Sequence, residues 1–265
     1  MAGKRLYSAL WQRLCTYAQV NQTTCAMLQR LQNAFASMDQ MVRNQERTAN
    51  NLANVETAGY KRDRVFIEAL NERLDNEGAP RTDRLPTQFA DLTEGDLDRT
   101  DNPLDVALTG PGFFVVEDEA SGEMRYTRDG RFVQDNEGMI RSTDGALLHT
   151  ENGPLVMPPD ASSIEISQDG LVRVNGEESG RIRVVDFNDP MDLERREGAT
   201  FVTDQQPVEL EQPAMQQGFI EGSNVNALHE MTEMMSHFRL FESQQKAMQT
   251  TDQILGQLVR DTGRF

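Results

Sequence analysis

The sequence predicts an α+β protein in which long N- and C-terminal helices pair as a coiled coil around a central, all-antiparallel β domain. Two observations support this fold class. Near each end of the chain, apolar residues recur at alternating spacings of three and four, which is the pattern of a helical seam. Between the two seams, five Asn-Gly or Asp-Gly pairs lie between residues 129 and 176, where they suit tight hairpin turns.

The first predicted helix begins near Met27 and ends between Asn54 and Gly59, where a glycine can adopt a left-handed cap. We expect residues 1–26 to be an added or disordered extension and Met27 to be the initiator. This extension holds both cysteines, at positions 15 and 25, and their spacing is no metal signature. The seam of the helix comprises Leu28, Leu31, Phe35, Met38, Val42, Gln45, Ala49 and Leu52.

Residues 61–100 are predicted to form an extended linker, because they are charged and contain Pro80 and Pro86, which interrupt helices. The β domain follows over residues 101–212, with short strands separated by turn pairs. The predicted strands cover residues 104–108, 112–117, 124–127, 131–133, 146–149, 163–167, 171–174, 181–187 and 200–202.

The second long helix is predicted to start after Asn226, a good N-cap, with Glu230 in its first turn, and to run to about Arg260. Residues 27–60 and 222–262 would then form one terminal-helix domain. Both helices carry many glutamines outside their seams, which favours packing against other chains; the alternative is an ordinary helical hairpin with a polar face. The second seam comprises Met231, Met234, Phe238, Phe241, Gln245, Met248, Asp252, Leu255 and Val259.

Composition argues against several functions. The formal net charge of −17 disfavours binding to nucleic acid or anionic lipid, and no apolar run in the sequence is long enough for membrane insertion. His149, His229 and His237 are too dispersed to suggest a metal site, and acidic pairs such as Glu117 with Glu119 arise by chance in so acidic a chain. We therefore expect no catalytic, cofactor-binding or metal-binding residues, although a secreted carbohydrate-active or binding β domain remains an alternative.

Three sequence blocks resemble the bacterial flagellar basal-body rod proteins of the FlgF/FlgG family and the related hook proteins. The first spans residues 49–62 and reads ANNLANVETAGYKR. The second starts at Asn102 and Pro103 and continues through residues 112–116 and 126–130, and the third spans residues 221–226, EGSNVN. The resemblance covers about residues 27–265.

The resemblance implies a structural, self-assembling axial subunit rather than an enzyme. Its terminal helices would line the inner wall of a tube, with the β domain outside. The implied partners are copies of the chain, other flagellar rod proteins and the flagellar type III export apparatus, and the implied location is the periplasm-spanning rod of the basal body. Residues 74–84 are acidic and short where distal-rod proteins carry a glycine-rich stretch, which favours a proximal-rod protein over a distal-rod or hook-type protein.

The candidate assembly residues follow from the seams and the blocks. Asn50, Asn51 and Asn54 would set helix register through buried amide bonds or simply cap the helix exit, and Asn224 with Asn226 would cap the return helix. One of Phe113 and Phe114 would lie in the core and the other could touch a neighbouring subunit. The full set is Leu31, Phe35, Met38, Val42, Asn50, Asn51, Leu52, Asn54, Gly59, Asn102, Pro103, Asp105, Gly112, Phe113, Phe114, Asn224, Val225, Asn226, Met231, Phe238, Phe241, Met248 and Leu255.

Overall fold

A computed structural model describes residues 22–66, 87–158, 161, 163–196, 198–210 and 212–262. The chain divides into two compact units, one made of residues 1–46 and 232–265 and the other of residues 47–231. Most of the predicted extension, residues 1–21, lies outside the described residues, as does the acidic segment 74–84. The start expected at Met27 is preceded by five helical residues.

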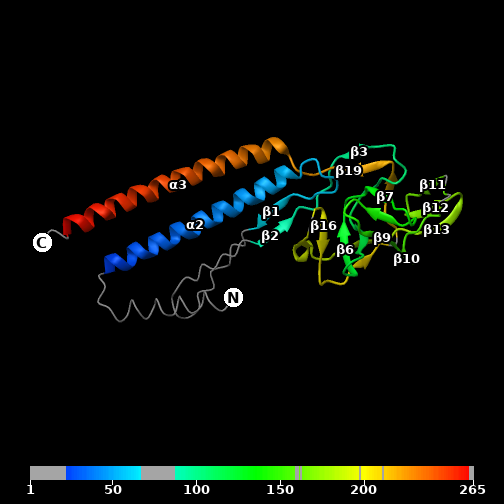
Figure 1. Cartoon of the computed structure of the whole chain (residues 1–265), viewed down its shortest axis with the longest axis horizontal. Helices are drawn as coiled ribbons and strands as arrows, with labels where there is room; N and C mark the ends of the chain where they lie inside the picture. The colour runs from blue at the N-terminus through cyan, green and yellow to red at the C-terminus, as the bar shows by residue number, and fades with distance from the viewer. Residues whose placement is uncertain are drawn as a thin grey trace. The chain divides into compact units, whose positions relative to one another are not determined.

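Two long helices run through the first unit and continue a short way into the second: α2 (Gln22–Ala53) and α3 (Ala227–Thr262) (Figure 1). The predicted coiled-coil pairing of these helices is wrong. Within the described residues, large side chains of both predicted seams are exposed to solvent. The heptad spacing shows that each helix has an apolar stripe, but it does not identify which surface covers that stripe. The exposed fractions are 57% for Phe35, 40% for Val42 and 51% for Phe238.

No helix in the described part of the chain is both long enough and apolar enough to cross a lipid bilayer.

The second unit contains a ten-stranded antiparallel sheet, in agreement with the predicted class of the β domain. Its main path runs β15-β16-β6-β5-β9-β8-β7, while β14 pairs with β5 and β17, and β10 pairs with β9. The strands are β5 (Phe113–Asp118), β6 (Glu123–Thr127), β7 (Phe132–Gln134), β8 (Ile140–Ser142), β9 (Leu147–Thr150), β10 (Gly153–Pro154), β14 (Val184–Asp186), β15 (Glu194–Arg195), β16 (Thr200–Val202) and β17 (Val208–Glu209), with a short 3-10 helix, η1 (Pro190–Asp192).

Strand β5 lies between two apolar cores, because successive side chains point to opposite faces of the sheet. Phe114 and Val116 belong to one core, and Phe113 and Val115 belong to the other. Phe113 and Phe114 are therefore both buried, and neither is available to a neighbouring subunit, contrary to our expectation for one of the two.

Smaller antiparallel sheets complete the unit. β11 (Ile164–Ile166), β12 (Leu171–Val174) and β13 (Glu177–Arg181) form one of them, and β1 (Asp63–Phe66) pairs with β2 (Thr87–Ala90) within the segment expected to be a linker. The chain then returns after the β domain in two short strands. β18 (Met215–Gln217) pairs with β4 (Val106–Leu108), and β19 (Phe219–Glu221) pairs with β3 (Leu97–Arg99).

This return brings the start of α3 to the end of α2. The backbone amide of Gly59, just after α2, donates to the carbonyl of Glu221 at 2.7 Å, and Gly222 donates to Asp96 at 2.8 Å. The pairings of β18 and β19 thus assemble residues from three distant parts of the sequence at one place.

Candidate functional site: a buried polar junction

The candidate site is a buried polar cluster where the end of α2, the segment 59–63, the turn at 128–129 and the start of α3 meet. We call this cluster the junction; it lies wholly within residues 47–231. It contains Asn51, Tyr60, Lys61, Arg62, Asp63, Arg128, Glu221, Asn224 and Glu230, most of which are almost fully buried.

Asn54 ends α2. Its side-chain amide donates to the carbonyl of Asn50 at 2.8 Å, and its own carbonyl accepts the amide of Thr57. These bonds satisfy backbone groups that the helix end would otherwise leave open. The chain can therefore turn sharply toward β1.

Asn51, one turn earlier, is fully buried and uses both ends of its amide. Its nitrogen donates to the carbonyl of Asp63 at 3.1 Å and to Glu230 Oε2 at 3.3 Å. Its oxygen accepts the amide of Asp63 at 2.9 Å and the hydroxyl of Tyr60 at 3.3 Å. One side chain thus links the last turn of α2 to β1 and to the first turn of α3.

Glu230 provides the negative charge at this end of the junction. It is fully buried, and Arg62 Nε lies 2.6 Å from its Oε1. The first turn of α3 is capped by Asn226, whose side-chain oxygen accepts the amide of His229 at 3.0 Å. A carboxylate in the first helical turn also interacts favourably with the helix dipole.

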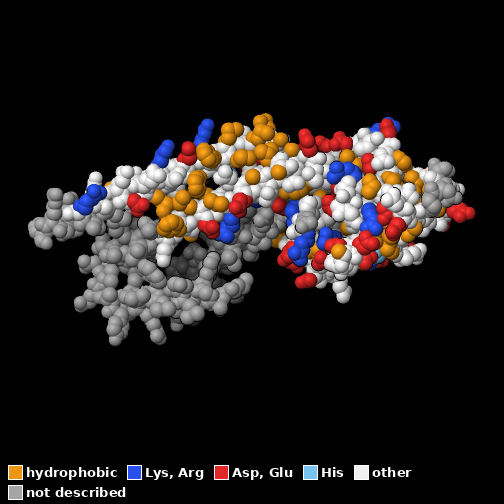
Figure 2. Space-filling view, viewed as in Figure 1, with side chains coloured by type: hydrophobic (Ala, Val, Ile, Leu, Met, Phe, Trp, Pro, Cys, Tyr) orange, Lys and Arg blue, Asp and Glu red, His pale blue; other side chains and the backbone are white. Residues whose placement is uncertain are grey.

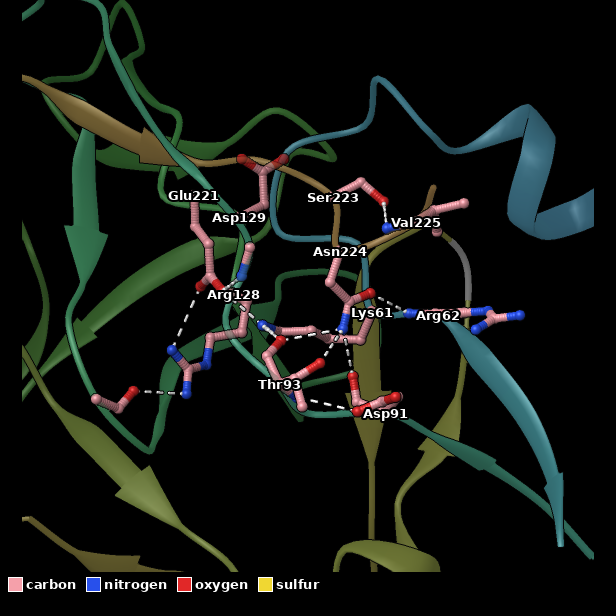
Figure 3. Close-up of polar contacts among 12 residues, drawn as sticks. Lys61, Arg62, Asp91, Thr93, Arg128, Asp129, Glu221, Ser223, Asn224 and Val225 are labelled. Carbon is pink, nitrogen blue, oxygen red and sulfur yellow. Dashed lines mark hydrogen bonds and ion pairs between the residues drawn. The ribbon is translucent and has the colours of Figure 1, made fainter. Parts of the chain in front are cut away.

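Glu221, at the end of β19, is the centre of the second half of the junction (Figure 3). Its Oε1 accepts Lys61 Nζ at 2.5 Å and the amide of Gly95 at 2.9 Å, and its Oε2 accepts Arg128 Nη1 at 3.3 Å. The carboxylate therefore neutralises charge on two buried cations while accepting a backbone bond.

Burial lowers the pKa of both cations. Desolvation lowers the pKa of Lys61, while Glu221 opposes that shift, and Arg128 adds to it. The pKa of Arg128 is also lowered, mainly by burial, and Glu221 again opposes that shift. Each cation gains one further acceptor, since Lys61 donates to the carbonyl of Thr93 and Arg128 to that of Gly110, both at 2.8 Å.

Asn224 joins the junction to the loop after β2. Its oxygen accepts the amide of Arg62 at 2.7 Å, and its nitrogen donates to the carbonyls of Asp91 at 2.8 Å and Thr93 at 3.0 Å. Figure 3 shows this side chain lying among Arg62, Thr93 and Asp91. The neighbouring Val225 is also buried.

Arg195 contacts the junction although the sequence did not indicate it, because it lies outside all three blocks. It reaches from β15 to Asp63 Oδ1 at 3.0 Å, and its guanidinium carbon lies 4.3 Å from the centre of the Tyr60 ring. The sheet is thereby attached to the segment that follows α2.

The other predicted residues fall into two groups. Asn102 donates to Asp105 at 2.9 Å, and Pro103 accepts from Gln217, so these residues shape the turn into β4 rather than the junction. Among the stripe residues, Phe35, Val42, Met231 and Phe238 are exposed, and Met38, Leu52, Phe241 and Met248 are half-buried; the side chains of Leu31 and Leu255 lie outside the described residues.

One group of described residues, His229, Glu230 and Glu233, has ligand atoms close enough to hold a metal ion. Glu230 is already held by Arg62 and Asn51. A cation on Glu230 disfavours a second one, so this arrangement fits an ion pair better than a metal centre.

Comparisons with known proteins identify the class to which the chain belongs. Residues 107–174 match the family model of the flagellar hook protein FlgE/F/G D1 domain, and residues 216–261 match that of the flagellar basal body rod FlgEFG protein C-terminal region. The chain is thus of the class of flagellar hook and basal-body rod proteins.

Relatives narrow the class. The chain is 30% identical to the flagellar basal-body rod protein FlgG of Buchnera aphidicola over 79% of this chain and 90% of the relative. It is also 30% identical to FlgF of Caulobacter vibrioides, over 82% and 91%, and to FlgG of Bacillus subtilis, over 88% and 98%. The chain belongs to the family of flagellar basal-body rod proteins, which are structural proteins of the flagellum.

The first prediction concerns the charge of Glu221. Changing Glu221→Gln keeps the shape of the side chain but leaves Lys61 and Arg128 buried without their shared carboxylate. We expect the free energy of unfolding, measured by urea titration, to fall by about 3–5 kcal/mol. The matched control is Glu209→Gln, because Glu209 pairs with Arg183 at 2.7 Å on the surface and its loss should change little. Equal stability of the two variants would contradict a charge-dependent junction.

The second prediction concerns Gly59, which has a φ of 67° and touches the 128–129 turn so closely that an added Cβ would lie 2.2 Å from the amide nitrogen of Asp129. We expect Gly59→Ala to lower the free energy of unfolding by about 3 kcal/mol or more.

The control for this change is Gly176→Ala. Gly176 also has a positive φ, 87°, but an added Cβ would meet nothing within 4 Å. The free energy of unfolding of the Gly176→Ala variant should fall by about 1 kcal/mol, from backbone strain alone. If both alanine variants lost the same stability, close packing at Gly59 would not matter.

Proposed function

We propose that this chain is a self-assembling subunit of the proximal rod, and that the exposed stripes of α2 and α3 pack against neighbouring subunits. The neighbours would be copies of the chain and other flagellar rod proteins. The observation that carries the proposal is the exposure of large apolar side chains along both helices, as Figure 2 shows.

These stripes are costly in an isolated chain. On α2 they expose Phe35 and Val42, and on α3 they expose Met231 and Phe238. Burying such side chains stabilises an assembly by roughly 1.5–3 kcal/mol for each large side chain. Contiguous apolar surface on a soluble protein commonly marks an interaction site.

The polar faces of the helices support contacts on more than one side. Gln32 and Gln40 on α2 and Gln249 and Gln253 on α3 are exposed. An amide can hydrogen-bond to a neighbouring subunit without burying an unpaired charge, which costs several kcal/mol. Both helices can therefore be surrounded by protein without a large electrostatic penalty.

The junction also supports a role as a rod subunit, because it attaches the helices to the β domain. It fixes the last turn of α2 and the first turn of α3 to the β domain through buried ion pairs and amide bonds. A subunit that transmits torque needs such a connection, because a flexible link would dissipate the load between the helices and the sheet.

The position within the flagellar axis is a separate part of the proposal. The proximal rod is favoured by the short acidic segment 74–84, which lies outside the described residues, while the similar proteins include both FlgG and FlgF. A distal-rod or hook-type position is the alternative. Electron cryo-tomography of basal bodies carrying a labelled chain would distinguish these positions. The proposed route through the flagellar type III export apparatus is tested by measuring secretion of the chain in an export-deficient strain.

The third prediction tests the stripes. We expect Phe35→Ser and Phe238→Ser to leave the helical content of the purified monomer unchanged, because both side chains are already exposed, and to abolish swimming in a strain that lacks the wild-type gene.

Val133→Ser is the matched control, since Val133 is 51% exposed but lies on β7 rather than on a helix. Swimming zones in soft agar and counts of assembled basal bodies provide the measurement. Normal motility of the Phe35→Ser and Phe238→Ser strains would overturn the role of the stripes.

A further inference from the structure

The first turns of α3 present a methionine-containing apolar face. Leu228, Met231, Met235 and Phe238 lie at successive spacings of three, four and three, so they share one side of the helix. All four are exposed. We call this face the α3 stripe; it shares Met231 and Phe238 with the seam predicted from the sequence.

The two methionines of the α3 stripe differ sharply from the methionines of the β domain. Met231 is 46% exposed and Met235 is 57% exposed, whereas Met157 is 5% exposed and Met215 is 3% exposed. Solvent access to the thioether sulfur governs its oxidation, and Met157 and Met215 lie in the larger apolar core. One chain thus contains both exposed and buried methionines.

We propose that Met231 and Met235 form an oxidative modification site, at which peroxide converts an assembly face into a polar one. The thioether sulfur attacks one oxygen of hydrogen peroxide, and the O–O bond breaks as the S–O bond forms. The proton on the transferred oxygen passes to the departing hydroxide, so the products are the sulfoxide and one water molecule, with the sulfur oxidised and the peroxide reduced by two electrons. Its consequence for assembly rests on the proposed function of the stripes.

The physical effect follows from the chemistry of the product. A sulfoxide is polar and a strong hydrogen-bond acceptor, whereas the thioether is apolar and adapts its shape to irregular surfaces. An oxidised stripe would bury an unsatisfied acceptor against each neighbour, which opposes association. The modification is reversible, because methionine sulfoxide reductases restore the thioether.

Peptide mapping tests the site independently of assembly. The full chain is treated with hydrogen peroxide under native conditions, quenched at intervals and analysed by mass spectrometry. We expect sulfoxide to form at Met231 and Met235 at least about ten times faster than at Met157 and Met215. Equal rates at the four positions in the folded chain would overturn the proposal.

Sedimentation velocity tests the consequence. Peroxide should weaken self-association of the wild-type chain roughly ten-fold or more, and treatment with a sulfoxide reductase should restore it. In the double variant Met231→Leu/Met235→Leu, peroxide should no longer weaken self-association. Each variant is compared with its own untreated sample. Met191→Leu should remain sensitive, because Met191 is 44% exposed but lies in η1, away from α3.

The outcomes separate the two proposals. A wild-type chain that does not associate before treatment would contradict the proposed self-assembly, while the mapping would still decide the modification site. Association that survives full oxidation of Met231 and Met235 would overturn the inference and leave the proposed function intact.

Discussion

The connection between the helix ends and the β domain depends on one buried carboxylate, that of Glu221. Two cations and a backbone amide share this carboxylate. Lys61 and Arg128 come from segments far apart in the sequence, and neither side chain can remain buried and charged without it. An apolar core tolerates many packings of similar volume. A buried ion cluster tolerates few, because most displacements leave a charge without a partner. The junction therefore specifies one connection between the helix ends and the sheet, rather than adding only to stability.

Asn51 and Glu230 extend the same constraint to the helices. The two helix ends meet through an amide and a carboxylate, and Arg62 and Asp63 complete their bonding. The apolar stripes remain available elsewhere along α2 and α3. Polar residues thus establish the internal connection, and the exposed apolar residues of α2 and α3 form the surface that we propose for contacts with other chains. This division explains why the helices carry strong heptad patterns although they do not pair with each other.

Much of the fold was predictable because it follows local rules. The strands around β5, β6, β12 and β16 have apolar character between glycine-containing turns, and α2 and α3 have long helical periodicity. The short strands β3, β18 and β19 were missed, since each has only three residues and carries no periodic signal. The predicted coiled coil was wrong because spacing reveals a stripe and not its partner. In the site, Lys61 and Glu221 lay within recognised blocks, but charged residues are usually on the surface, and Arg195 had no signal at all.

The bonds of the junction span long separations along the chain: Lys61 and Glu221 are 160 positions apart, and Asn51 and Glu230 are 179 apart. Closing such large loops is entropically unfavourable until the final contacts form. A nascent polypeptide cannot complete the junction before residue 230 has left the ribosome. Asn51 and Lys61 therefore lack Glu230 and Glu221 as partners through most of translation. Because its contacts are so far apart in the sequence, the junction forms late in the folding of each newly made chain.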